Sequence, residues 1–427
     1  MEKLYTVKYG EEKIEMSLNE NNVIQVLESK EVELIKDIEK EINYLLDNPI
    51  DSKSFDEIFL KKDKVAIVVS DITRAWIQTS KFLPHIVARL NKNGISDADI
   101  IIIIANGTHR SQTNNELSKI VGTDIYNRIE IIEHNCDENL VFIGQTSRGT
   151  DVEINKLVVD RKVILTGGIV HHLMAGFGGG RKSILPGVAG RKTINQNHLH
   201  SLDPKNPHSN PLIGAGVLKG NPLSLDMIEA AKMINPEFLV NSIVNTKGEI
   251  IKLVAGNWLT AWEEGCKWTD ENFGVTINEK ADVVIASCGG YPKDINLYQS
   301  TKSLFNAVRA LKNGGTLILL AECRDGAGAD AFFNWVEPLK RGDLDNELRN
   351  NFNIPGYIFY AAIEAIKDNN VILLSSISPE KVEPMGMQAV NSFGSALKKA
   401  GLDNKNNDSK IIIMPYAGST VPMFHKK

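Results

Sequence analysis

The sequence of 427 residues is poor in cysteine and lacks long apolar runs. Its four cysteines stand far apart and form no C-x-x-C pair, so neither a disulfide framework nor a thiolate zinc site is expected. No stretch approaches the ~18 consecutive apolar residues of a membrane span, and the first twenty residues lack the apolar core of a signal peptide. We therefore expect a cytoplasmic protein with no membrane partner.

The chain also lacks a strong charge of either sign. It has 48 basic and 53 acidic residues, a net charge of −5, with no long run of one sign. The basic surface of a nucleic-acid binder is therefore missing, and a small neutral or anionic ligand fits better. Hydrophobic residues at 42% and charged residues at 24% are typical of globular proteins, and this length favours two or three domains.

Short β-branched runs alternate with helical spacing in the first half of the chain. Strands are predicted at 65–70, 100–105, 129–133 and 162–166, and a helix closed by Gly94 is predicted at 80–93. Such strand–helix–strand units form parallel sheets covered on both faces, and ligands bind beyond the carboxyl ends of the strands.

The same pattern restarts near residue 281. It predicts strands at 281–287, 316–320, 371–375 and 411–414, and a helix at 297–311 that stops before Gly314-Gly315. The predicted fold class is α/β, with two α/β domains of parallel or mixed sheets. We predict a cofactor-binding domain at 1–274 and a second domain at 275–410, with 411–427 as a candidate to complete the first. The Pro- and Gly-rich segment 201–222 predicts an irregular connection.

Histidine is the most informative residue type. Two histidines, His172 and His198, flank the loop Ala175-Gly-Phe-Gly-Gly-Gly-Arg-Lys-Ser183, whose glycines would let backbone N–H groups approach an anion. A ligand is therefore expected at this loop. We interpret four other histidines as ordinary surface or core residues, namely His85, His134, His208 and His425.

The loop does not match the common nucleotide motifs. It approaches the P-loop pattern, but Arg181 separates the last glycine from Lys182, and about ten residues lie between the preceding strand and the glycines. The dinucleotide pattern fails at the same arginine. We therefore reject a P-loop NTPase, and a conventional Rossmann NAD site is a weak interpretation.

Polar residues follow two predicted strands, and a third polar group lies on a predicted helix. Asp71-Ile-Thr-Arg74 follows the first strand and Asn106-Gly-Thr-His-Arg110 follows the second, so Asp71, Arg74 and His109 are predicted to converge at one sheet edge. Helix capping by Asp71 or Thr108 is the alternative. In the second domain Gln299 and Lys302 lie three apart on one helix face, which suits a carboxylate, with a solvated helix start as the alternative.

Taken together, these segments resemble the nickel-dependent lactate racemase family, in order from Asp71 to Lys302. The longest shared segment runs from His172 to Gly187 and is followed by Asn197-His198. One departure is Ala75-Trp76, where many family members continue with proline. The resemblance implies two α/β domains with the active site in the cleft between them, and an isomerase: a racemase or epimerase of lactate or a related 2-hydroxy carboxylate.

The resemblance also implies a cofactor. It is pyridinium-3-thioamide-5-thiocarboxylic acid mononucleotide, which holds nickel and is attached covalently at the position of Lys182. His198 matches the nickel ligand. Accessory cofactor-synthesis proteins are implied as partners. The further cofactor-binding positions implied are Asp71, Thr73, Arg74, Gly179 and Gly180.

The implied reaction is reversible hydride transfer to the pyridinium through a 2-keto acid. His109 and His172 match the two residues that alternate as acid and base. The positions implied to hold the substrate are Arg74, Tyr298, Gln299 and Lys302. Two alternatives stay open, namely an NAD- or ATP-dependent enzyme that uses the glycine-rich loop, and a non-catalytic cofactor-binding protein.

Overall fold

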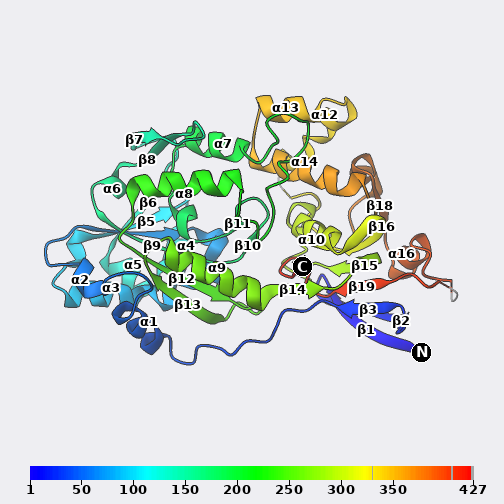
Figure 1. Ribbon diagram of the computed structural model, residues 1–427, viewed down its shortest axis with the longest axis horizontal. Coiled ribbons are helices and arrows are strands. Elements are labelled where there is room, and N and C mark those ends of the chain that lie inside the picture. The colour runs from blue at the N-terminus through cyan, green and yellow to red at the C-terminus, as the bar shows by residue number, and fades with distance from the viewer. Residues whose placement is uncertain (329, 405–406, 425–427) are drawn as a thin grey trace. The chain divides into compact units, whose positions relative to one another are not determined.

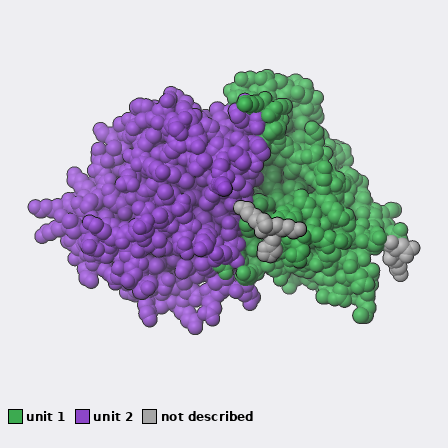
Figure 2. All heavy atoms as spheres, viewed as in Figure 1, with its two compact units in different colours: residues 1–30, 205–209, 272–427 green, residues 31–204, 210–271 purple. Residues whose placement is uncertain are grey.

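The computed structural model describes residues 1–328, 330–404 and 407–424, so His425 lies outside the described residues. The chain divides into two compact units, coloured separately in Figure 2. Unit 1 comprises Met1–Lys30, Lys205–Ser209 and Asn272–Lys427, and unit 2 comprises Glu31–Pro204 and Asn210–Glu271. The main division after Glu271 lies close to the expected boundary after residue 274.

Unit 2 is built on a six-stranded sheet with the strand order β13-β12-β9-β4-β5-β6 (Figure 1). All neighbouring strands are parallel except β12 and β13, which are antiparallel. The strands are β4 (Val65–Ser70), β5 (Ile100–Ala105), β6 (Glu130–Glu133), β9 (Lys162–Gly168), β12 (Phe238–Val244) and β13 (Ile250–Gly256). The four strands expected in this half are thus present, and the α/β fold class is confirmed.

Aliphatic side chains cover both faces of this sheet. In β4, Ile67 and Val69 belong to the cluster that packs against the surrounding helices, whereas Ala66 and Val68, which point to the opposite face, are equally buried. A strand buried on both faces reads as a continuous apolar run, which is why this part of the sheet is predictable. The helices of this cluster are α1 (Ile38–Asp47), α2 (Phe55–Ile58), α3 (Leu83–Lys92), α4 (Asn114–Val121) and α5 (Thr123–Arg128).

Smaller elements complete unit 2. No helix or strand lies between α7 and α8, as expected for an irregular segment from 201 to 222. The elements are the hairpin β7 (Leu140–Gln145) and β8 (Asp151–Asn155), α6 (Lys156–Val159), the short pair β10 (His171–His172) and β11 (Gly176–Phe177), α7 (Arg191–Leu199), α8 (Pro222–Ile234) and α9 (Thr260–Phe273).

Unit 1 contains a second six-stranded sheet, in which all pairs are parallel and the order is β18-β17-β16-β15-β19-β3. Gly314-Gly315 lies inside β16 rather than ending the preceding helix, because a register irregularity between β15 and β16 absorbs the left-handed Gly314. The strands are β3 (Val23–Val26), β15 (Ala281–Ser287), β16 (Leu311–Leu320), β17 (Asn370–Leu374), β18 (Met387–Val390) and β19 (Ile411–Met414).

Both chain ends depart from the expected domain assignment. The strand β19 lies between β15 and β3, so its buried apolar residues complete unit 1 and not the first domain. The N-terminal hairpin of β1 (Glu2–Tyr9) and β2 (Glu12–Asn19) places Val7 and Met16 in the core of the same unit. Residues 1–30 therefore belong with the C-terminal half of the chain.

The other elements of unit 1 are mostly helical. They are β14 (Gly274–Ile277), α10 (Leu297–Arg309), α11 (Asp330–Phe333), α12 (Val336–Lys340), α13 (Leu344–Asn350), α14 (Ile354–Lys367), α15 (Pro379–Val382), α16 (Phe393–Lys399) and β20 (Val421–Phe424). Among the described residues, no helix has both the length and the apolar character needed to cross a membrane. All four cysteines are free and buried.

Candidate active site

Neighbouring strands bring Asp71 and His109 together at the carboxyl edge of the unit 2 sheet. Asp71 follows β4 directly, and His109 follows the adjacent strand β5 after a short turn. The His109 Nδ1 atom lies 2.5 Å from Asp71 Oδ2. Since a carboxylate only accepts hydrogen bonds, the proton of the neutral ring lies on Nδ1, and Nε2 keeps its lone pair.

Asp71 is held as a carboxylate. Only 3% of it is exposed, and burial alone would raise its pKa, but hydrogen bonds from His109 and Thr73 together with the nearby Arg74 charge lower the pKa below the usual value. The Thr73 hydroxyl donates to Asp71 Oδ1 at 2.7 Å, and Arg74 donates to that hydroxyl at 2.9 Å. Thr73 and Arg74 therefore belong to the same polar cluster as Asp71 and His109.

His172 lies in β10, after the strand β9 that neighbours β4 on its other side. Its Nδ1 atom accepts hydrogen bonds from the backbone N–H groups of Met174 and Ala175, both at 3.2 Å. The neutral ring consequently carries its proton on Nε2. Burial, followed by the charges of Lys182 and Arg74, lowers the pKa of His172 well below its usual value.

The glycine-rich loop is packed too tightly to accept side chains. Gly180 has a φ of +56°, and a Cβ atom there would lie 2.5 Å from Trp262 Cγ. The N–H of Gly180 donates to the Asn241 side chain, and the N–H of Lys182 donates to the Gly179 carbonyl. These two amides are thus satisfied within the protein, so the glycines serve close packing here rather than supplying those donors to an anion.

Arg181 anchors this loop from inside. It is fully buried, donates to the carbonyls of Ala175 and Phe177 and to the Ser224 hydroxyl, and stacks over Trp262 with its guanidinium carbon 3.9 Å from the ring centre. Burial lowers its pKa to about 10. The loop then enters a short 3-10 turn at Gly180–Ser183, not the long helix of a P-loop.

Lys182 follows this anchor and is partly buried. Burial first, and then the positive charges of Arg74 and Arg181, lower the pKa of Lys182 well below its usual value. Such a lysine loses its proton more readily than a surface lysine and is a better nucleophile. Lys182 also lies near His172, whose pKa it lowers.

His198 lies in the last turn of α7 and is only 4% exposed. Its Nδ1–H donates to the Ile194 carbonyl at 2.8 Å, so Nε2 holds a lone pair that could bind a metal. Burial lowers the pKa of His198 to about 4. The ring is therefore neutral at physiological pH, as metal binding requires.

The remaining expected site residues lie in unit 1, in the first turns of α10. Asn296 caps this helix, because its side chain accepts a hydrogen bond from the Gln299 N–H at 2.9 Å. Lys302 Nζ donates to Gln299 Oε1 at 2.7 Å, so the two polar groups share one helix face as expected. The Tyr298 ring packs edge-on against Phe332.

Family models match both halves of the sequence. The lactate racemase N-terminal domain matches residues 9–209, and the lactate racemase C-terminal domain matches residues 276–421. The chain belongs to the lactate racemase family.

Individual relatives of this family cover nearly the whole chain. The lactate racemase of Thermoanaerobacterium thermosaccharolyticum is 34% identical over 97% of this chain and 98% of its own length, and that of Lactiplantibacillus plantarum is 32% identical over 87% of both chains. The structure of the T. thermosaccharolyticum lactate racemase apoprotein superposes with a TM-score of 0.89 and 32% identity, covering 99% of this chain and 100% of that one. A Thermotoga maritima protein with 19% identity and a TM-score of 0.63 shares the fold.

In this lactate racemase family member, sequence reasoning missed several residues that support the site. Asn241 and Trp262 hold the glycine-rich loop, but neither lies in a recognisable motif. Asp226 could have been noticed, because it interrupts the apolar face formed by Leu223 and Met227 of α8. Within the described residues, no group of three or more His, Cys, Asp or Glu side chains is arranged to hold a metal ion.

Proposed function

We propose that this chain is a racemase that interconverts the enantiomers of lactate or of a closely related 2-hydroxy carboxylate. The observation that carries the proposal is the His109–Asp71 pair at the carboxyl edge of the unit 2 sheet. Both curated relatives described above are named lactate racemase. The pair supplies the proton acceptor that a hydroxy-acid racemase needs at the substrate hydroxyl.

In this proposal His109 takes the hydroxyl proton of one enantiomer at Nε2. The resulting imidazolium is stabilised by the Asp71 carboxylate, whose lowered pKa keeps it ionised. Asp71 also fixes the ring orientation through the 2.5 Å contact to Nδ1. Asp71 is thus the positioning residue and His109 the catalytic residue.

His172 is proposed to serve the opposite enantiomer. Since its Nδ1 atom accepts hydrogen bonds from the Met174 and Ala175 N–H groups, taking the hydroxyl proton at Nε2 would first require the ring to move or turn over. In the cofactor-free chain its pKa is lowered by burial and by the charges of Lys182 and Arg74. An amide-type bond at Lys182 would remove one of these charges, so the pKa of His172 would rise towards the range in which imidazole both accepts and donates protons.

The residues around the loop fit a nickel-carrying pyridinium mononucleotide. Lys182 offers a nucleophilic amine for the covalent link, and His198 offers a free Nε2 lone pair for nickel. When bound, this cofactor supplies an electron-poor acceptor for the hydrogen on the α-carbon of the substrate. The further cofactor contacts that we propose are Asp71, Thr73, Arg74, Gly179 and Gly180, and the proposed partners are accessory proteins that synthesise the cofactor.

The proposed substrate contacts are cationic and polar side chains, namely Arg74 of unit 2 and Tyr298, Gln299 and Lys302 of unit 1. Arg74 contributes a guanidinium, which suits a carboxylate. In unit 1 the ammonium of Lys302 and the amide of Gln299 are held side by side, with Tyr298 in the same helical turn. A 2-hydroxy carboxylate would be recognised by these groups through its negative charge.

The test uses holoprotein from cells that make the cofactor. Intact mass should show an adduct that Lys182→Ala abolishes, and His198→Ala should lose nickel while the exposed His208→Ala keeps it. Incubation with L-lactate deuterated at the α-carbon should yield D-lactate that keeps most of its deuterium in ordinary water, because hydride does not exchange with solvent.

Three results would contradict the proposal. An adduct that survives Lys182→Ala would place the attachment elsewhere. Complete loss of deuterium in a single turnover would favour proton transfer between two bases. A verified holoprotein that racemises neither lactate nor any related 2-hydroxy acid would refute the function itself.

A further inference from the structure

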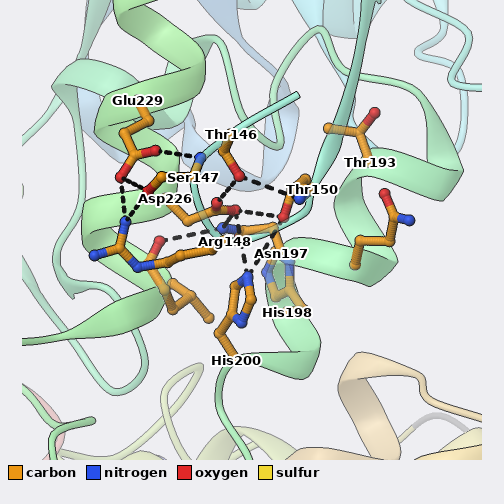
Figure 3. Close-up of polar contacts among 12 residues, drawn as sticks. Thr146, Ser147, Arg148, Thr150, Thr193, Asn197, His198, His200, Asp226 and Glu229 are labelled. Carbon is orange, nitrogen blue, oxygen red and sulfur yellow. Dashed lines mark hydrogen bonds and ion pairs between the residues drawn. The ribbon is translucent and has the colours of Figure 1, made fainter. Parts of the chain in front are cut away.

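A fully buried carboxylate, Asp226 on α8, lies at the centre of the polar contacts in Figure 3. Its Oδ1 accepts from the Thr146 hydroxyl at 2.5 Å, and its Oδ2 accepts from the Thr150 hydroxyl at 2.8 Å and from the Asn197 amide at 2.9 Å. His200 Nε2 lies 3.7 Å from Oδ2. Asp226 therefore joins three segments, namely its own helix, the β7–β8 turn and the end of α7.

The contacts from α7 lie on both sides of His198. Asn197 precedes it and also donates to the Leu223 carbonyl at 3.1 Å, so one side chain bridges α7 to the first turn of α8. His200 caps the end of α7 and touches the Thr150 hydroxyl at 3.4 Å. Among the described residues, the His198 ring hydrogen-bonds to the Ile194 carbonyl of its own helix and to no other group, so its position follows the position of this last turn.

Burial of a carboxylate that is balanced by neutral groups costs folding free energy, because three neutral hydrogen-bond donors replace its hydration only in part. An apolar side chain at this position of α8 would pack equally well. The two hydrogen bonds of Asn197, to Asp226 and to the Leu223 carbonyl, in contrast, fix the end of α7 relative to α8, and the two threonine hydrogen bonds fix Asp226 relative to the β7–β8 turn. A metal ligand needs a fixed position of this kind, and the residues that surround the ligand hold it in the orientation that binds the metal.

We propose that Asp226 is a positioning residue for the metal ligand His198, acting through Asn197 and His200. The inference rests on the proposed function, since it concerns the nickel ligand named there. Asp226 itself does not touch the metal; it holds the last turn of α7 where the Nε2 atom of His198 can bind.

Glu229 provides a matched control on the same helix. It lies one turn after Asp226 and accepts hydrogen bonds from the N–H and hydroxyl of Ser147, in the same β7–β8 turn, and it pairs with Arg148. Within the described part of the chain, Glu229 makes no hydrogen bond to α7. Glu229→Gln therefore perturbs the hairpin turn and α8 without loosening the turn that carries His198.

The experiment measures nickel retention rather than activity. Holoprotein is challenged with excess chelator, and nickel per chain is followed with time by metal analysis. We expect Asp226→Asn to release nickel about 10- to 100-fold faster than wild type and Glu229→Gln to release it at the wild-type rate. A second control, Ile102→Val in the middle of β5, is expected to lower the melting temperature without touching α7, and it should keep the wild-type release rate.

Thr150 keeps the test decisive where Asp226→Asn fails to fold. Thr150→Val removes one donor to Asp226, whereas Thr150→Ser retains the hydroxyl, so only the valine variant should release nickel faster. Unchanged release from the folded Asp226→Asn or Thr150→Val variant would overturn the inference, as would equal acceleration in Ile102→Val at matched stability. If His198→Ala retains nickel, the proposed function fails first; if it loses nickel while Asp226→Asn keeps it, only the role of Asp226 fails.

Discussion

Buried histidines make the stability of unit 2 depend on pH. His134 donates from Nε2 to the Ala189 carbonyl at 3.0 Å and faces the Asn155 amide nitrogen with Nδ1, so the ring is neutral. Burial lowers its pKa below the usual 6.5. Between the lowered folded value and 6.5 the unfolded chain binds more protons, so stability should fall as the pH drops below about 6.5.

His134→Gln should flatten this pH dependence, since glutamine offers a donor and an acceptor without titrating. The slope that is lost is at most about 1.4 kcal/mol per pH unit. This slope is measured by unfolding the protein in urea at pH 8 and at pH 5.5 and monitoring unit 2 by hydrogen exchange. His208→Gln, at an exposed position of unit 1, should leave the slope of unit 2 unchanged. Equal slopes in wild type and His134→Gln would contradict the assignment.

A second residue-scale prediction concerns the Asp71–His109 pair. Asp71→Asn should lower kcat by ~10²- to 10⁴-fold with little change in KM, because the imidazolium of His109 loses its counter-charge. Asp270→Asn is the matched control: it breaks another Asp–His contact, 2.7 Å from His171, outside the proposed chemistry, and should keep kcat near wild type. Equal losses in both variants would mean that the Asp71 effect is structural.

At this scale the sequence predicted that Asp71 and His109 lie together, but not the residues that surround the site. Asp71 and His109 were identifiable because each follows a buried strand, and adjacent parallel strands end at the same edge. The partners that fix the site come from distant segments. Asn241 and Trp262 lie more than 55 residues beyond the loop they support, and no local pattern reports such a contact.

At the scale of elements, the tight packing of the glycine-rich loop can be tested with two glycines. Gly180 and Gly149 both have positive φ, +56° and +85°, but a Cβ atom at Gly149 would meet nothing within 4 Å. Gly149→Ala should therefore cost only the backbone strain, about 1 kcal/mol. Gly180→Ala should lower the free energy of unfolding by ~1–3 kcal/mol more than Gly149→Ala does, because Trp262 must move away from Arg181.

Urea denaturation of the two apoproteins measures this difference. A Gly180→Ala variant as stable as Gly149→Ala would show that Trp262 moves without cost. Cofactor content of the holoproteins adds a second readout, since displacement of Arg181 should disturb the neighbouring Lys182.

Complete burial helped the prediction of several strands but did not decide it, because β12 and β13 are buried along nearly their whole length and were not expected, whereas the partly exposed β6 was. Strands β4, β5 and β15 are buried along nearly their whole length and matched the expected ranges. The hairpins β1–β2 and β7–β8 expose one face, and β3 is four residues long, so their patterns are short and mixed. Gly314-Gly315 was wrongly expected to end a helix, because glycines can mark either the end of a helix or an irregularity in a strand.

At the scale of the whole molecule, the N-terminal hairpin is expected to stabilise the C-terminal unit. Met16 is 1% exposed in the core of unit 1, whereas Leu4 of the same hairpin is 60% exposed. Met16→Ala should therefore cost about 2–5 kcal/mol, and Leu4→Ala should change stability by less than about 0.5 kcal/mol. Hydrogen exchange should show the loss of protection in β15, β16 and β17, with β4 and β5 unaffected.

Loss of protection in β4 and β5 instead would assign the hairpin to unit 2, as the sequence had suggested. The division could not be predicted from the sequence, because a chain that leaves a unit and returns to it has no local signature. Only the pairing of β3 with β19 reveals that the two ends of the chain complete the same sheet.

This pairing sets an order of events during translation. Residues 23–26 leave the ribosome about 390 residues before their partner strand at 411–413. At ~5–20 residues per second, the first strand waits roughly 20 to 80 s for its neighbour. The residues of unit 2 lie between these two strands in the sequence, so unit 2 can bury its own core in that interval. The nascent chain thus carries an unpaired, partly apolar segment at residues 23–26 until the partner strand has been made.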